Sequence, residues 1–318
     1  MTRTSFCRWS HSNTVVLIWV SSAIIFFLVF HMALDNSLSS SRLNQSSDPG
    51  YASTSAKQRS ALYEKMARDL DEHGASFLQG GATSQSLSIS DIFSFKDDSV
   101  IPILKAADPP VRATVLYLYP ESAKPISDTV KSIFMQYFGR AIWFQNASLY
   151  HFSMFHASHH LEPVTATPDE IEAEGNAIKA VAEVICPLKI ILDRVVLTST
   201  GVLLGCWQVT SGTDPVDIRA KLRNALPHAP QKQLYNPVML HTSLARLLGP
   251  PQMSSQEKHM HSDQLKLFQD LVERANQKLK GFEATISELW FVEEFDVLAL
   301  ALNGRMKVRK FDLICSNG

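Results

Sequence analysis

The stretch LYHFSM at residues 149–154 has a counterpart further along the chain, MLHTSL at residues 239–244. Each copy reads histidine, any residue, serine and an apolar residue, and each lies within a run that predicts a β-strand. Because the side chains of a strand alternate between its two faces, His151 shares a face with Ser153, and His241 shares a face with Ser243. Each strand is therefore expected to present one imidazole beside one hydroxyl.

The sequence around these strands predicts an α+β domain made of two related halves. In the first half we expect strands at 113–119 and 149–155 and helices at 126–138 and 167–184. In the second half we expect helices at 214–226 and 265–279, and strands at 190–198, 202–209, 238–245, 286–291, 297–302 and 307–314. This order, with hairpins between strands, is typical of a two-lobed α+β fold whose antiparallel sheets surround a central cleft.

The two histidine–serine pairs suit the cleavage of a phosphodiester. A neutral imidazole can remove a proton from an attacking water or hydroxyl, and a protonated imidazole can donate one to the leaving oxygen. Histidine titrates near neutral pH, so both states are accessible. The hydroxyls of Ser153 and Ser243 can donate hydrogen bonds to the non-bridging phosphate oxygens, where charge gathers in the transition state. This chemistry needs no metal and no cofactor.

Paired His-x-Ser/Thr-apolar motifs, one in each half of a two-lobed α+β domain, resemble the signature of the 2H phosphoesterase superfamily. That superfamily includes cyclic phosphodiesterases and RNA 2′-5′ ligase-like proteins, and the resemblance covers residues 100–317. It implies that His151 and His241 act as general acid and base and that Ser153 and Ser243 bind phosphate. The implied substrate is a 2′,3′-cyclic phosphate, or a related phosphodiester, of a nucleotide or RNA end. Which histidine is the base does not follow from the sequence.

Two alternatives remain open. The first is a catalytically inactive module that binds a nucleotide or RNA on the same fold. The second is a type II membrane glycosyltransferase, suggested by an anchor followed by a stem. Metal-dependent glycosyltransferases hold a nucleotide sugar with an Asp-x-Asp triplet, and the one such triplet here, Asp69 to Asp71, lies in a predicted helix and not at a strand end.

A histidine-rich stretch at residues 151–160 raises the question of a transition-metal site, since imidazole is a common metal ligand. However, His151 and His156 are expected on opposite faces of a continued strand. No acidic residue lies among the histidines of this stretch. A polar loop after the strand is therefore the preferred interpretation, and we expect no metal site.

The chain begins with a segment that is expected to anchor it in a membrane. No Asp, Glu, Lys or Arg interrupts residues 14–34, and a helix of about 20 apolar residues spans a bilayer core. The alternative, a cleavable signal peptide, usually has a shorter apolar stretch. Arg3 and Arg8 precede the segment, so the positive-inside rule places residues 1–13 in the cytosol. We expect a type II single-pass protein of the ER, Golgi or plasma membrane, with its domain outside the cytosol.

Two sequons agree with that location. Asn44 and Asn146 each begin an Asn-x-Ser triplet and are candidates for glycosylation. Residues 35–99 are expected to form a stem or linker, because residues 36–60 are rich in Ser, Asn and Gln. A helical pattern at 61–78 belongs either to the stem or to the beginning of the domain, which we place at 100–318.

Charge and cysteine content limit the remaining possibilities. The formal net charge is −1 and the sequence pI is about 6.8, so duplex DNA is not an expected partner. No two cysteines form a C-x-x-C pair, and the pairing among Cys186, Cys206 and Cys315 stays open. The oligomeric state also stays open.

Overall fold

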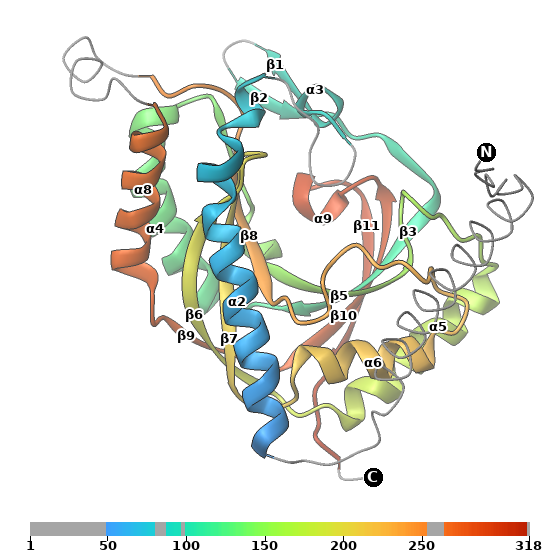
Figure 1. Ribbon diagram of the computed structural model, residues 1–318. Helices are drawn as coiled ribbons and strands as arrows, with labels where there is room; N and C mark the ends of the chain where they lie inside the picture. Colours follow the sequence, from blue (N-terminus) through green and yellow to red (C-terminus); the bar gives the residue numbers. More distant parts are fainter. Residues whose placement is uncertain (1–48, 80–86, 97–98, 253–263, 317–318) are drawn as a thin grey trace, which may run out of the picture. The chain divides into compact units, whose positions relative to one another are not determined.

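The computed structural model describes residues 49–79, 87–96, 99–252 and 264–316, which from Gly50 onward belong to one compact unit, Gly50–Gly318 (Figure 1). Its helices are α2 (Pro49–His73), α3 (Ile89–Ile92), α4 (Pro120–Phe138), α5 (Pro168–Val184), α6 (Pro215–Ala225), α8 (Gln264–Leu279) and α9 (Ala299–Leu302). Its strands are β1 (Phe93–Lys96), β2 (Ser99–Pro102), β3 (Ala106–Tyr117), β4 (Ile142–Phe144), β5 (His151–Ser158), β6 (Leu188–Leu197), β7 (Val202–Ser211), β8 (His241–Leu247), β9 (Glu283–Ile286), β10 (Glu288–Asp296) and β11 (Met306–Asp312).

Two antiparallel sheets form the frame of the unit. The four-stranded sheet has the order β11-β10-β3-β5, and the five-stranded sheet has the order β4-β8-β7-β6-β9. The predicted α+β class with antiparallel sheets is confirmed. The two halves of the chain nevertheless exchange strands, because β4 joins the later sheet and the hairpin β10–β11 joins the earlier one.

Helices α4 and α8 pack together, and α8 lies on β6 (Figure 1). Helices α5 and α6 pack on each other, α6 on β5 and α5 on β10 and β11. Phe138 of α4 stacks on Phe268 of α8 with ring centroids 5.9 Å apart. Each such fully buried phenylalanine contributes about 1.5–3 kcal/mol to the stability. Helix α5 begins at the predicted place, since Thr167 and Glu170 form a reciprocal capping box.

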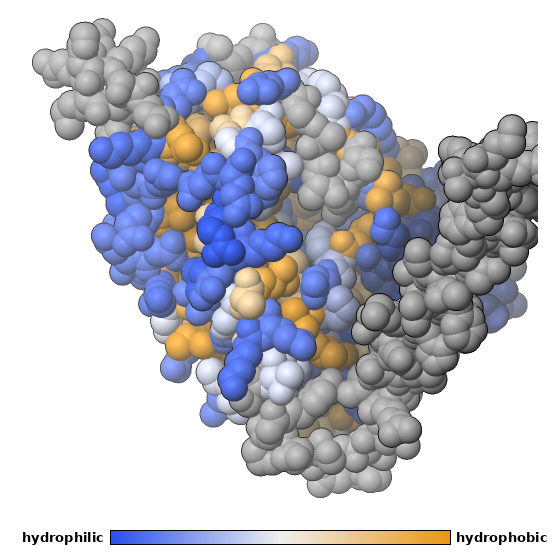
Figure 2. Space-filling model, viewed as in Figure 1, coloured by the Kyte–Doolittle hydropathy of each residue, from blue (hydrophilic) through white to orange (hydrophobic). Residues whose placement is uncertain are grey.

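Helix α2 is the first element of the compact unit, which therefore begins at Gly50 and not near residue 100. Its buried residues Arg59, Tyr63 and Leu70 lie at helical spacing on one side. Tyr63 packs in a cluster with residues of β6 and β7. This cluster lies on the same face of the five-stranded sheet as the side chain of His241. Hydrophilic residues cover the outward side of the helix (Figure 2). Of the two possibilities left by the sequence, the structure favours the domain over the stem.

One predicted strand is wrong. Residues 297–302 form a turn and the short helix α9, with left-handed backbone at Leu298 (φ 60°) and Asn303 (φ 56°). The run VLALAL is apolar because Ala299, Leu300 and Leu302 are buried. A short apolar run cannot be assigned to strand or helix from periodicity alone. Strand β10 instead occupies the preceding residues 288–296 without a break.

The expected membrane localisation is corrected. None of the helices that the structure describes combines the length and the apolar character needed to cross a membrane. The segment 14–34, on which the expected signal anchor rests, lies outside the described residues. The type II single-pass assignment is therefore withdrawn.

The structure resolves the cysteine pairing. Cys186, just after α5, forms a disulfide with Cys315 near the C-terminus, and Cys206 on β7 is a buried free thiol. Burial raises the pKa of the Cys206 thiol well above its ordinary value. Cys206 is thus an inert core residue, while the disulfide fastens the segment after β11 to the end of α5.

Replacing Cys315 with serine is expected to lower the free energy of unfolding by about 2–5 kcal/mol. The disulfide spans a sequence separation of 129 residues, and a cross-link over a long loop restricts the unfolded chain strongly. Chemical denaturation of C315S and of the oxidised wild-type chain measures the difference. A reductant should destabilise the wild type by a similar amount and leave C315S unchanged; equal stability of both oxidised proteins would contradict the prediction.

Candidate active site

A cavity between the two larger sheets, with a volume of about 570 Å³, receives all four side chains of the two motifs. His151 and Ser153 line it from β5, and His241 and Ser243 line it from β8. The two strands touch beside it, because Thr242 Oγ1 donates a 3.0 Å hydrogen bond to the backbone oxygen of His151. Residues that are far apart in the sequence therefore share one site.

Strand β5 contains a β-bulge directly after its serine. Ser153 lies opposite Val115 of β3, whereas Phe155 lies opposite the adjacent residue Thr114. Met154 is therefore an extra residue in the strand. An extra residue reverses the alternation of side chains beyond it.

Strand β8 repeats this irregularity at the equivalent position. Ser243 lies opposite Leu204 of β7, whereas Ala245 lies opposite the adjacent residue Leu203. Leu244 is therefore the extra residue here. The two motifs thus share a bulge as well as a sequence pattern.

The bulges bring a third pair of side chains into the cavity, His156 from β5 and Arg246 from β8. Without the bulge, His156 would lie on the face opposite His151, as the sequence predicted. With the bulge, both histidines line the cavity, so that expectation was wrong. The sequence contains one signal for His156 and Arg246, because each of them stands three positions after the serine of its motif.

The two histidines that follow β5, His159 and His160, also line the cavity. Among the described residues, no group of three or more His, Cys, Asp or Glu side chains is placed to hold a metal ion. His159 Nδ1 accepts a hydrogen bond from the backbone of Glu162, and its Nε2 donates to the backbone oxygen of Lys232, each over 3.1 Å. His159 thus holds the loop together.

The environment of His151 defines which ring nitrogen is available. Its Nδ1 lies 2.8 Å from the backbone oxygen of Leu149. A carbonyl oxygen only accepts, so Nδ1 carries a proton and Nε2 is the nitrogen that titrates. Burial lowers the pKa of His151 from its ordinary value, and the hydrogen bond to Leu149 opposes that shift.

The ring of His241 is buried and shielded from solvent. Its Nδ1 is buried and makes no hydrogen bond with the described residues. The ring of Tyr235 packs against it with centroids 4.8 Å apart. Burial, followed by the positive charges of Arg219 and His151, lowers the pKa of His241 to about 3. His241 is therefore neutral at physiological pH.

Arg246 brings a positive charge to the same cavity. Its Nη1 is buried and has no hydrogen-bond partner among the residues that the structure describes. Burial lowers the pKa of the guanidinium to about 10, so the group stays charged at neutral pH. A buried guanidinium nitrogen without a hydrogen-bond partner is costly, which makes this end of the cavity favourable for a ligand whose oxygens accept hydrogen bonds, such as a phosphate.

Other residues that the sequence singled out lie elsewhere. Asp69 accepts a hydrogen bond from the backbone of Ser199, and Asp71 accepts one from the Gln269 side chain. The two carboxylates of the triplet therefore have separate partners. Asn146 is exposed and its side chain accepts from the backbone of Ser148, and glycosylation there stays a prediction. Asn44 lies outside the described residues.

Comparison with known proteins gives similarities of fold alone. No family model and no curated protein matches the sequence. Among solved structures, the chain is similar to TT0787 of Thermus thermophilus, with 12% identity, a TM-score of 0.43, and coverage of 65% of this chain and 100% of that one. It is similar to Escherichia coli LigT complexed with 3′-AMP, with 14% identity, a TM-score of 0.38, and coverage of 64% and 98%. A conserved Agrobacterium tumefaciens protein of unknown function, ATU0111, matches with 12% identity, a TM-score of 0.43, and coverage of 62% and 84%.

Proposed function

We propose that this protein is a metal-independent phosphoesterase that hydrolyses a 2′,3′-cyclic phosphate, or a related phosphodiester, of a nucleotide or RNA end. The observation that supports it best is that two histidine–serine pairs, from strands of different sheets, line one cavity. The unpaired guanidinium nitrogen of Arg246 in that cavity adds a reason to expect an anionic ligand. His151 and His241 are the proposed catalytic residues.

We assign His241 as the general base and His151 as the general acid. The pKa of His241 is held at about 3, so this ring is neutral and free to accept a proton. The hydrogen bond from His151 Nδ1 to Leu149 favours the protonated ring, which opposes the effect of burial. Of the two histidines, His151 is thus the one better able to hold a proton for the leaving group.

The proposed reaction is a single displacement at phosphorus. His241 takes a proton from water while the water oxygen bonds to phosphorus. One ester oxygen of the cyclic phosphate leaves and receives the proton of His151, so the product is a phosphate monoester beside a free hydroxyl. Ser153, Ser243 and Arg246 are proposed to bind the non-bridging oxygens, where negative charge increases.

The direct test incubates the full-length chain with the four 2′,3′-cyclic nucleotides in the presence of a chelator. We expect conversion to a nucleoside monophosphate, detected by chromatography or phosphorus NMR, with 3′,5′-cyclic nucleotides as the control substrates. Binding of the 2′,3′-cyclic nucleotides without product, at high protein concentration, would favour the inactive binding module. Loss of turnover on addition of the chelator would contradict the metal-independent mechanism.

Replacing Arg246 with methionine is expected to lower kcat/KM about 10- to 150-fold, because a charge-assisted hydrogen bond to a phosphate oxygen contributes about 1.5–3 kcal/mol. Methionine keeps the apolar stem and removes the charge. Steady-state kinetics with a 2′,3′-cyclic nucleotide measure the effect, and Arg246→Lys should recover part of it by restoring the charge. Full activity in the methionine variant would show that Arg246 does not bind the phosphate.

A further inference from the structure

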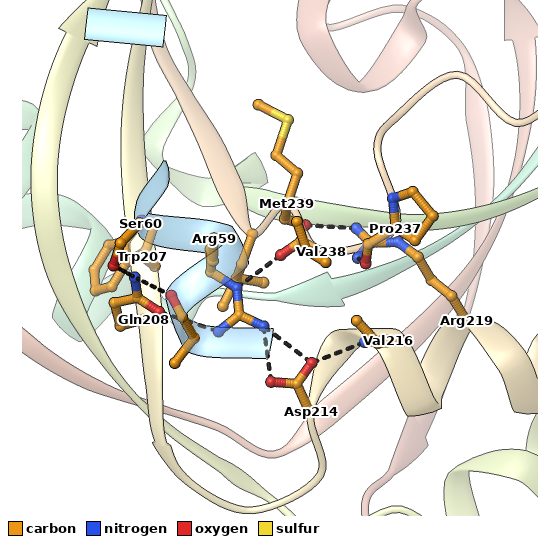
Figure 3. Close-up of polar contacts among 12 residues, drawn as sticks. Arg59, Ser60, Trp207, Gln208, Asp214, Val216, Arg219, Pro237, Val238 and Met239 are labelled. Atoms are coloured by element: carbon orange, nitrogen blue, oxygen red, sulfur yellow. Dashed lines mark hydrogen bonds and ion pairs between the residues drawn. The ribbon is translucent and has the colours of Figure 1, made fainter. Parts of the chain in front are cut away.

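The segment that leads into His241 is held by side chains as well as by strand β7, whose Trp207 backbone nitrogen donates a 2.9 Å hydrogen bond to the oxygen of Leu240. Residues 237–240 precede β8, and each of their four backbone oxygens accepts a hydrogen bond from a buried side chain. Figure 3 shows the two arginines among the donors beside Pro237, Val238 and Met239. The donors are three residues: Arg219 bonds Pro237 and Met239, Arg59 bonds Val238 over 2.7 Å, and Tyr63 bonds Leu240 over 2.7 Å.

Arg219 joins the two histidine strands. Besides the segment before His241, its guanidinium donates to the backbone oxygens of Ser153, over 2.9 Å, and Met154, over 3.0 Å. These two residues form the bulge on β5. A single planar guanidinium with fixed donor directions therefore sets the bulge that follows His151 against the segment that precedes His241.

Arg59 connects helix α2 to the same hydrogen-bond network. It is fully buried and donates two hydrogen bonds, of 2.9 and 2.7 Å, to the carboxylate of Asp214. Asp214 also caps α6 by accepting from the backbone of Val216, as Figure 3 shows. Helix α6 carries Arg219, so the Arg59–Asp214 pair orients the helix that presents the bridging arginine.

Tyr63 acts closest to the proposed base. Its hydroxyl accepts a 3.0 Å hydrogen bond from the backbone nitrogen of Leu240 and lies 2.7 Å from the oxygen of the same residue. Leu240 is the immediate neighbour of His241. Because Tyr63 is fully buried, no solvent competes for these bonds.

We infer that helix α2 is a positioning element of the active site, in which Arg59 and Tyr63, together with Arg219 of α6, hold residues 237–240 so that the His241 ring faces the cavity. The catalytic consequence rests on the proposed function, whereas the placement of His241 does not. None of these three residues is proposed to touch the substrate. They are positioning residues, and α2 lies outside the two motif-bearing halves of the chain.

The test uses Tyr63→Phe and Arg59→Lys in the full-length chain. Tyr63→Phe keeps the ring and removes the hydroxyl beside Leu240, and Arg59→Lys keeps the charge opposite Asp214 but loses the fork that also reaches Val238. Arg68→Met, an exposed residue of the same helix, is the matched control. Histidine-labelled NMR follows the His241 ring signal and its titration, and steady-state kinetics follow kcat and KM.

We expect Tyr63→Phe to shift the His241 ring signal and to lower kcat about 10- to 100-fold with KM little changed, because small misplacements of a catalytic group have effects of that size. Arg59→Lys should have a smaller effect in the same direction, and Arg68→Met none. Unchanged His241 signals and kcat in Tyr63→Phe would overturn the inference. If the wild-type chain has no turnover, the proposed function fails, and the NMR comparison alone still decides whether α2 positions His241.

Discussion

Alanine at His241 is expected to reduce kcat for a 2′,3′-cyclic nucleotide by about 10²- to 10⁴-fold, the usual contribution of a general base. The ring lies in the cavity with a pKa of about 3 and is neutral at the pH of the assay. Alanine at His151 should have an effect of similar size, because the leaving oxygen then departs without a proton. The double variant should be little slower than either single one, since residues that act as a unit are not additive.

The control for these variants is His228→Ala, because His228 is exposed and lies outside the cavity. Circular dichroism and thermal melting establish that each variant is folded before its rate is compared. Normal turnover in both His151→Ala and His241→Ala would remove the two histidines from the mechanism. Loss of turnover with retained nucleotide binding is the pattern that the proposed acid and base require.

The pH dependence is the second large effect. We expect kcat/KM to peak below pH 6.5 and to fall about tenfold per pH unit above the pKa of His151. The productive free enzyme has His241 neutral and His151 protonated. The first condition is met above pH 3, and the second is lost as the pH rises through the pKa of His151, which burial places below 6.5. Over two pH units beyond that pKa the loss is about 100-fold.

Initial rates at low substrate concentration from pH 4 to pH 9 measure this profile. The profile of kcat should lie at higher pH than that of kcat/KM, because a bound phosphate anion raises the pKa of both histidines. A kcat/KM that increases between pH 7 and pH 9 would contradict the assignment of acid and base.

Acid stability sets the lower limit of the pH experiment. The pKa values of His156 and His241 are both lowered to about 3 in the folded protein, mainly by burial. Below pH 6.5 the unfolded chain therefore binds more protons than the folded one, and stability falls as the pH falls. Folding must be verified at each acidic pH. Otherwise a loss of rate caused by unfolding could be mistaken for the loss caused by protonation of the general base, His241.

The motif residues could be predicted from the sequence because strand alternation is a local rule. His151 with Ser153 and His241 with Ser243 needed only period-two geometry, and the beginning of α5 needed only the capping pattern at Thr167. Their use in catalysis stays a prediction.

The other features depend on distant partners. Met154 and Leu244 are apolar residues like their neighbours, and nothing in their type marks them as bulges. Arg59 is buried only because Asp214 and Val238, remote in sequence, accept its hydrogen bonds. A charged residue on a helix is normally assigned to the solvent side. The role of α2 therefore could not be derived from its own sequence.

The exchange of strands between the two sheets has a consequence for autonomous folding. Strands β3 and β5 would have to pair without β10 and β11 if the first half of the chain stood alone, and β8 would lose β4 in an isolated second half. Neither half is thus a separable module, although each carries its own motif. A chain that must complete both sheets through contacts distant in sequence has a high contact order, so its folding is expected to be slow and concerted.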